Sequence, residues 1–181
     1  GAGSAGCILA HRLSARETNR VLLIEAGTDY PPGTEPPEIL DSYSGSANYD
    51  PRFLWNEMVV SFRRTDANAP GELPRRRYEQ GRVIGGTSSI NGMMYIRGHA
   101  RDYDRWAQLG CHGWSYADIL PYFKKAEAHA LGGDEYHGAD GPLAVSAARM
   151  SNPICGAFVD AGVEAGYPKT ADVNGRQQEG F

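Results

Sequence analysis

The chain has 181 residues, which suits one domain of about 150 residues with an appendage, and its formal net charge at pH 7 is −4. Its basic residues are scattered apart from Arg75, Arg76 and Arg77, for which we predict a solvated turn, and this pattern argues against a nucleic-acid partner. No apolar run approaches the ~20 residues that span a bilayer, so we expect a soluble protein without a membrane-spanning segment.

The first stretch of the chain predicts a dinucleotide-binding βαβ unit. Residues 1–6 have the spacing G-x-G-x-x-G, in which the glycines allow a tight turn, a close approach to a pyrophosphate and close packing of helix on strand. Apolar residues at helical offsets predict a helix over 5–13, and the run 21–24 predicts a buried parallel strand that ends at Glu25. In such a unit, a carboxylate at this position accepts hydrogen bonds from the ribose hydroxyls. The alternative is an ordinary tight turn between a strand and a helix.

A strand is expected before the glycine turn. A Rossmann turn follows a parallel strand of about five or six residues, and the given sequence starts at the turn itself. We therefore expect the sequence to be a fragment whose sheet lacks its first strand.

The region after Glu25 is rich in proline and predicts a long irregular excursion over 27–51. Loops beyond about 15 residues inside compact domains are lids or linkers. Four aromatic residues favour a packed lid over a disordered linker: Tyr30, Tyr43, Tyr49 and Phe53. A weak alternation predicts a short strand within 55–62, and the polar stretch 66–77 predicts another loop.

A second group of glycines lies in residues 81–98. Gly85-Gly86 predicts a turn that passes close to another part of the molecule, and the hydroxyls of residues 87–89 predict a helix cap. Apolar side chains follow, which predicts a buried helix: Ile90, Met93, Met94 and Ile96. A buried helix start needs an acceptor or an anion, and a nucleotide bound at residues 1–6 supplies one. The alternative is a capped helix on the surface.

The last third of the chain predicts helices over 102–109 and 116–128, the second with a capping box of Ser115 and Asp118. A short strand is predicted over 142–146. Asn152 and Pro153 predict the start of a further helix by cap and first-turn chemistry. We expect three side chains to form the buried face of that helix: Phe158, Val159 and Val163.

The cysteines and histidines follow no metal or disulfide pattern. Cys7, Cys111 and Cys155 are far apart and form no C-x-x-C pair. The five histidines show neither H-x-x-x-H nor H-E-x-x-H spacing. We therefore expect no metal site, and a cytoplasmic location.

Residues 81–104 resemble the flavin motif of the glucose-methanol-choline (GMC) family of oxidoreductases. Asn91, Tyr95, Gly98 and Asp104 stand at the positions that the family pattern requires. The segment 25–27 is similar to the adenosine-ribose segment of the family, and the similarity extends over essentially the whole chain. It is closest to the bacterial choline-dehydrogenase-like and hydroxymethylfurfural-oxidase-like members.

The resemblance implies an α/β fold: a Rossmann-type FAD-binding domain over 1–150, with a lid at about 27–62 and the flavin motif at 81–104. Residues 151–181 then begin a substrate-binding domain. It also implies that the FAD pyrophosphate and ribose are contacted by Gly1, Gly3, Ser4, Ala5, Gly6, Glu25 and Ala26. The implied residues on the flavin side are Arg82, Val83, Gly86, Thr87, Asn91, Gly92, Met93 and Met94.

The activity implied by the resemblance is FAD-dependent oxidation of a small primary alcohol by hydride transfer to flavin N5, with O2, a quinone or a dye as electron acceptor. Some members attach FAD through a histidine, whose position here is Ile90, so we expect non-covalent FAD. The catalytic histidine of the family and its partner lie in the C-terminal part. We therefore expect the acid–base pair to lie C-terminal to this chain. Trp55 lies either against the cofactor or in the core.

Two other functions stay open on the sequence. A nicotinamide-dependent Rossmann dehydrogenase shares the first glycine motif, although the long proline-rich insertion counts against it, because βα units normally connect within about six residues. The other alternative is a non-catalytic fragment that binds a cofactor or serves a structural purpose.

Overall fold

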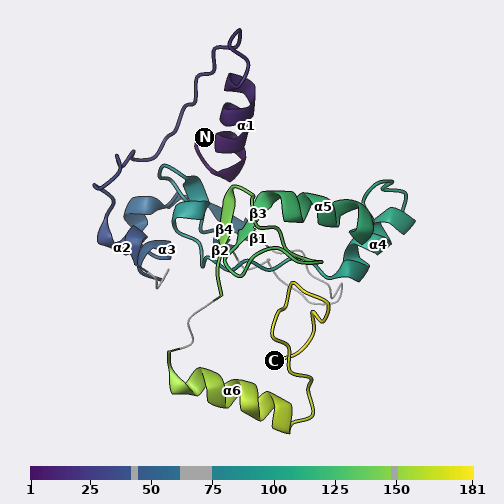
Figure 1. Ribbon diagram of the computed structural model, residues 1–181. Helices are drawn as coiled ribbons and strands as arrows, with labels where there is room; N and C mark the ends of the chain where they lie inside the picture. Colours follow the sequence, from purple (N-terminus) through teal and green to yellow (C-terminus); the bar gives the residue numbers. More distant parts are fainter. Residues whose placement is uncertain (42–44, 62–74, 148–150) are drawn as a thin grey trace, which may run out of the picture. The chain divides into compact units, whose positions relative to one another are not determined.

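The computed structural model describes residues 1–41, 45–61, 75–147 and 151–181. The chain forms two compact units, Gly1–Met94 and Tyr95–Phe181, whose elements are labelled in Figure 1. The predicted boundary at residue 150 separates two functional domains and stays a prediction. Within the described residues, no helix combines the length and apolar character that a membrane crossing requires.

The first unit is made of short elements around a small core. In chain order they are α1 (Ser4–Ser14), α2 (Pro37–Leu40), α3 (Gly45–Asn48), the 3-10 helix η1 (Pro51–Phe53), β1 (Val59–Ser61), β2 (Arg75–Arg77) and the 3-10 helix η2 (Gly86–Ser89). The buried core side chains come from the lid region and from the second glycine motif: Ala47, Phe53, Leu54, Val83 and Ile90. The core therefore ties the lid directly to the flavin-like motif.

The packing predicted for the aromatic residues after Glu25 is confirmed in part, and the role of this region as a lid stays a prediction. Phe53 is fully buried, and its ring meets that of Tyr30 edge to face at 6.3 Å. Tyr49 is instead 70% exposed, and Tyr43 lies outside the described residues. The short strand predicted within 55–62 is β1, which is limited to three residues.

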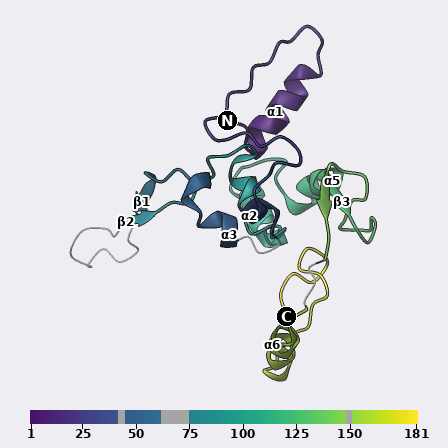
Figure 2. The same ribbon diagram turned by 90° about the vertical axis from the view of Figure 1, so that its left-hand side faces the viewer.

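The solvated turn predicted for the three arginines is wrong. Arg75–Arg77 form β2, which lies beside β1 (Figure 2). The two strands pair antiparallel, with Val59 opposite Arg77. All three residues are exposed, because backbone pairing with β1 needs no burial of the side chains. The remainder of the predicted loop, residues 66–74, lies outside the described residues.

The helix predicted over 5–13 is α1, whereas the buried strand predicted over 21–24 is wrong. These residues are irregular, with Leu22 82% and Ile24 70% exposed. A parallel strand exists only where its backbone pairs with a neighbour. Among the described residues, the first bridge after this run is formed by Thr28, which pairs in parallel with Val83 as an isolated bridge. The apolar run therefore has no sheet to join in this part of the chain.

The second unit contains α4 (Ala100–Gln108), α5 (Tyr116–Ala126), β3 (Glu127–His129), β4 (Leu143–Val145) and α6 (Pro153–Glu164). The predicted capping box of α5 is confirmed, since Ser115 Oγ accepts from the Asp118 N–H while Asp118 accepts from the Ser115 N–H. The helix ends at Ala126 rather than at 128, because Glu127–His129 pair in parallel with β4. Figure 1 shows α4, α5 and β3 following one another in this unit.

The predicted start of α6 is confirmed, and its predicted buried face is wrong. Asn152 caps the helix through the Ile154 N–H, with Pro153 in the first turn. Phe158 is 66% exposed, and the buried residue of the helix is Gly162. The Phe181 ring occupies the space that a side chain at 162 needs, with a ring carbon 2.4 Å from an added Cβ. The absence of a side chain at Gly162 therefore makes room for the Phe181 ring, which also lies 5.3 Å from the Phe158 ring.

Candidate nucleotide site

The two glycine motifs of the sequence meet in the first unit. Gly3 forms an isolated parallel bridge with Gly85. Gly86 has a φ of +60°, and a Cβ added there would lie 2.9 Å from the Gly3 Cα. Only a residue without a side chain fits this left-handed backbone at that distance. The prediction that Gly85-Gly86 passes close to another part of the molecule is therefore confirmed.

Close backbone packing continues on both sides of this contact. A Cβ added at Gly6 would lie 1.8 Å from the Gly1 carbonyl oxygen, so α1 packs directly on the turn before it. Gly27 is equally restricted, because a Cβ there would lie 2.2 Å from the backbone of Arg82. The structure thus joins residues 1–6, Gly27 and the second motif into one backbone assembly.

The start of α1 is open to an acceptor. Gly3 is its N-cap and provides no side-chain hydrogen bond. The first intrahelical donor is the Cys7 N–H, which donates to the Gly3 carbonyl at 3.0 Å. By helix geometry, the N–H groups of Ser4, Ala5 and Gly6 have no intrahelical acceptor, and the positive end of the helix dipole coincides with them. This arrangement is the one that binds a phosphate.

Glu25 bends back to the glycine turn. Its Oε1 accepts from the Gly27 N–H at 2.8 Å, and its Oε2 accepts from the Ala2 N–H at 2.6 Å. These hydrogen bonds, that of Gly27 first, lower the pKa of the Glu25 carboxyl below its usual range. The side chain is therefore a carboxylate at neutral pH, and each oxygen keeps further lone-pair capacity for a hydroxyl donor.

The buried helix predicted after the second glycine motif is wrong. Gly86–Ser89 form the short 3-10 helix η2, and the chain is then irregular to residue 98. Asn91 Oδ1 accepts from the Met93 N–H at 2.9 Å, and Met93 has a φ of +54°. Such an Asx turn offers the backbone an alternative to a helix. Ile90 is buried, but Met93 and Met94 are 63% and 82% exposed.

The hydroxyls of the second motif bond backward onto the glycine turn. Ser88 Oγ donates to the Gly85 carbonyl at 2.7 Å, and Ser89 Oγ donates to the Ile84 carbonyl at 2.6 Å. Thr87 Oγ1 accepts from the Gly81 N–H at 3.0 Å. These bonds hold the turn that contacts Gly3.

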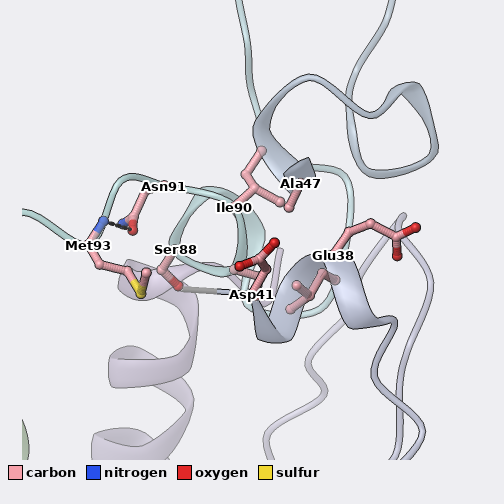
Figure 3. Close-up of a pocket in the computed structure, with 9 residues that line it drawn as sticks. Glu38, Asp41, Ala47, Ser88, Ile90, Asn91 and Met93 are labelled. Carbon is pink, nitrogen blue, oxygen red and sulfur yellow. Dashed lines mark hydrogen bonds between the residues drawn. The ribbon is translucent and has the colours of Figure 1, made fainter. Parts of the chain in front are cut away.

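Two pockets adjoin this assembly. One, of about 120 Å³, lies between the lid and the second motif; in Figure 3, Asn91 and Met93 lie at one end of it and Glu38 at the other. The second, of about 350 Å³, is lined by residues of α1, the lid and the second motif, among them Cys7, Tyr30 and Gly85. Ile39 and Ser89 line both pockets. The lid, α1 and the second glycine motif therefore line adjoining pockets.

The predicted site residues fall into three groups. The backbones of Gly1, Gly3, Gly6 and Gly86 come together with Glu25, as described above. Val83 is fully buried, so only its backbone can face a ligand, and the Arg82 guanidinium lies over the Trp55 ring at 5.0 Å. Trp55 is 41% exposed and is therefore not a core aromatic. Thr87 is half-buried and accepts from the Gly81 N–H. The remaining predicted residues are exposed: Ser4, Ala5, Ala26, Asn91, Gly92, Met93 and Met94.

Sequence reasoning missed the packing of Gly27 and Gly81. A Cβ at Gly81 would lie 2.5 Å from the Gly86 carbonyl carbon, so both residues are needed for close backbone contact. The signal in the sequence was a glycine shortly after the predicted strand 21–24 and another shortly after the predicted loop 66–77. The residues against which these glycines pack, however, depend on the path of the whole chain and could not be predicted from this signal.

The second unit gathers ionisable side chains that spacing did not reveal. The ligand atoms of Glu127, His129 and His137 lie within 4.8 Å of one another. Glu127 already accepts hydrogen bonds from His137 and from the Arg97 guanidinium, whose Nη2 is 2.7 Å from Oε2. A cation of the protein itself therefore occupies this carboxylate, and we interpret the group as an ion-pair cluster.

Comparison with known proteins gives a consistent assignment. Residues 1–181 match the GMC oxidoreductase family. The chain is 48% identical to the oxygen-dependent choline dehydrogenase of Vibrio vulnificus and 44% identical to the mitochondrial choline dehydrogenase of Homo sapiens; the alignments cover all of this chain and 31% and 30% of those proteins. It therefore spans about a third of the length of these relatives.

Solved structures agree with the sequence relatives. Pyridoxine 4-oxidase from Mesorbium loti superposes with a TM-score of 0.74 at 36% identity, over 99% of this chain and 34% of that one. An FAD-dependent oxidoreductase from Chaetomium thermophilum superposes with a TM-score of 0.77 at 30% identity, over 99% of this chain and 31% of that one. The α/β fold class predicted from the sequence is confirmed.

Proposed function

The chain belongs to the GMC oxidoreductase family, and from that premise we propose that it forms much of the FAD site of an enzyme that oxidises a small primary alcohol. Because it spans about a third of its relatives, the activity belongs to the whole protein of which it is a part. The nicotinamide-dependent alternative is set aside, since the family match covers residues 1–181.

The observation that carries the proposal is the contact between the two glycine motifs. A dinucleotide needs backbone that approaches its pyrophosphate without side chains in between. Gly3 and Gly86 lie so close that a Cβ at 86 would nearly reach the Gly3 Cα. The uncapped start of α1 and the ionised Glu25 adjoin this contact. These features fit the FAD pyrophosphate at Ser4, Ala5 and Gly6 and the ribose hydroxyls at Glu25.

In this proposal the residues of the chain bind and orient the cofactor. When bound, FAD accepts a hydride from the alcohol carbon, which is the chemistry that the protein groups alone do not provide. Asn91, Gly92, Met93 and Met94 lie on the exposed turn that we assign to the flavin side. The lid supplies one wall of the pocket next to Asn91. The catalytic base is proposed to lie outside this chain.

The cofactor is proposed to be non-covalent. Ile90 takes the position at which some family members carry the attaching histidine. Its side chain is hydrocarbon, is 1% exposed and belongs to the core. A buried hydrocarbon has no nucleophilic atom with which to bond a flavin.

The first substrate class to test is choline and similar small primary alcohols, because the relatives quoted above are choline dehydrogenases. The test uses the full-length protein that contains this chain. We expect it to copurify with flavin absorption bands near ~370 and ~450 nm, bleached anaerobically by its alcohol substrate. O2 and a quinone are then compared as acceptors. A folded protein that stays colourless with added FAD would overturn the proposal. The cytoplasmic location stays a prediction.

A further inference from the structure

His137 lies between two carboxylates in the second unit. Its Nδ1 is 3.0 Å from Glu127 Oε1, and its Nε2 is 2.7 Å from Asp172 Oδ2. Carboxylates in their ionised form only accept hydrogen bonds, so both ring nitrogens must donate. This arrangement is satisfied only by the doubly protonated imidazolium. A neutral ring would direct a nitrogen lone pair at one of the two carboxylates.

The two sides of this bridge differ in their freedom to move. The Glu127 side chain is fully buried and also accepts from Arg97 Nη2 at 2.7 Å and from the Gly138 N–H at 3.1 Å. The Asp172 side chain is 42% exposed. When the ring loses one proton, Nδ1–H keeps its hydrogen bond to Glu127, because that buried carboxylate cannot be solvated by water instead. Asp172, which water can solvate, is the side that opens.

Asp172 organises the segment that follows it. Its Oδ1 accepts from the Asn174 N–H at 2.9 Å. Asn174 in turn holds the stretch after the flavin-like motif: its Oδ1 accepts from the Arg97 N–H at 2.8 Å, and its Nδ2 donates to the Tyr95 carbonyl at 2.8 Å. Gln178 Oε1 accepts from the Ala100 N–H at 2.9 Å. The segment 172–178 is therefore bonded along residues 95–100.

We propose that His137 is a proton-operated clasp that holds residues 172–178 against 95–100 while its ring is charged and releases them when the ring becomes neutral. With a charged ring, Arg97 and His137 balance Glu127 and Asp172. With a neutral ring, a net negative charge is left in a largely buried cluster. The held stretch continues directly from Met94, the last residue of the predicted flavin contacts.

The groups that face His137 come from several elements. Glu127 and His129 come from β3, and the His129 ring lies 4.3 Å from the His137 ring. The Asp134 carboxylate accepts from the backbone N–H of His137 at 2.7 Å, and Lys124 of α5 donates to the Asp134 backbone carbonyl. The remaining partners are Asp172 and, through Glu127, Arg97.

The expected pH window follows from these contacts. Burial lowers the pKa of His137, but the hydrogen bonds to Asp172 and Glu127 outweigh it, and the pKa is raised above its usual 6.5. Burial likewise raises the pKa of Asp172, while the hydrogen bonds from His137 and the Asn174 N–H outweigh it and leave that pKa below 3.8. The stabilisation from His137 is thus complete below pH 6.5 and is lost as pH rises through the raised pKa. That from Asp172 is present above pH 3.8 and is lost in acid.

The test is hydrogen exchange of the full-length protein at about pH 6 and about pH 8.5, corrected for the intrinsic pH dependence of exchange. We expect peptides from 170–181 and 95–100 to lose at least tenfold in protection at the higher pH. His137→Gln should be weakly protected at both pH values. The matched control is His112→Gln, at an exposed histidine outside the cluster, which should respond like the wild type. Hydrogen exchange does not depend on flavin binding or on activity, so this test is separate from that of the proposed function.

A second variant covers the case in which His137→Gln does not fold. Asp172→Asn keeps the size of a partly exposed side chain and removes one carboxylate, so it should lower the pKa of His137. This pKa is measured by NMR of ¹⁵N-histidine-labelled protein. The variant should also reduce the pH response of the exchange. Wild-type protection that is equal at both pH values, a His137 that titrates at or below 6.5, or an unchanged response in Asp172→Asn would each overturn the clasp.

Discussion

Glu25 accepts a hydrogen bond from the Ala2 N–H at 2.6 Å, so the carboxylate that follows the first apolar run reaches back to the glycine turn that precedes α1. This contact brings the proposed ribose partner and the proposed pyrophosphate turn together. The N–H of Gly27 holds the other oxygen at 2.8 Å. The carboxylate is therefore oriented before any nucleotide binds.

Glu25→Ala should weaken FAD binding about tenfold or more, because one or two charge-assisted hydrogen bonds to the ribose, each about 1.5 to 3 kcal/mol, are lost. The measurement is a flavin-fluorescence titration of the full-length apoprotein. Glu17→Ala, at an exposed glutamate in the same region, is the matched control and should bind as the wild type does. Unchanged affinity of Glu25→Ala with intact circular dichroism would contradict the assignment of the ribose site.

Gly6→Ala should abolish or strongly reduce FAD retention and lower the melting temperature. The new methyl group would lie 1.8 Å from the Gly1 carbonyl oxygen, so α1 must move away from the turn. The control is Gly156→Ala in α6, where nothing described lies within 4 Å of the added Cβ. That change should retain FAD and stabilise the protein by about 0.5–1 kcal/mol, the usual gain for alanine over glycine inside a helix. Equal behaviour of the two variants would show that the close packing at Gly6 is not needed.

Denaturing the FAD-loaded full-length protein with acid or heat should release all of its flavin into the supernatant, because Ile90 offers no atom for a covalent bond. Flavin absorbance of the supernatant and of the washed precipitate is measured. A known covalent flavoprotein treated in parallel shows that the assay detects attached flavin. Flavin absorbance that stays with the washed precipitate of this protein would refute non-covalent binding.

The 181-residue chain expressed alone should show no alcohol oxidation with any electron acceptor. The proposed catalytic base lies outside this chain. The chain also exposes apolar side chains such as Leu22 and Met94, each 82% exposed, and such surfaces favour aggregation. Activity is assayed with choline, with O2 and with a dye. Coexpression with the remaining part of the full-length protein should restore turnover. FAD-dependent turnover by the 181-residue chain alone would mean that one of its own histidines acts as the base.

Features that depend on neighbouring residues could be predicted from the sequence. The capping box of Ser115 and Asp118 and the start of α6 at Asn152 are set by side chains that bond to backbone within three residues. The helix predicted over 5–13, observed as Ser4–Ser14, follows from apolar residues at helical offsets. The glycine spacing of residues 1–6 likewise indicated close backbone approach, since no other residue type permits it. Short-range geometry is nearly the same in every fold, so these local patterns predict the same local structure whatever the rest of the chain does.

Features that depend on the chain path were decided only by the tertiary structure. The apolar run at 21–24 is exposed because no described strand pairs with it, although its composition suits a buried strand. Gly86 packs against Gly3, and His137 lies within hydrogen-bonding distance of Asp172, although these residues are far apart in the sequence and no periodic pattern predicts the contacts. Whether a side chain is buried, charged or hydrogen-bonded depends on what long-range packing places beside it, and local sequence does not contain that partner.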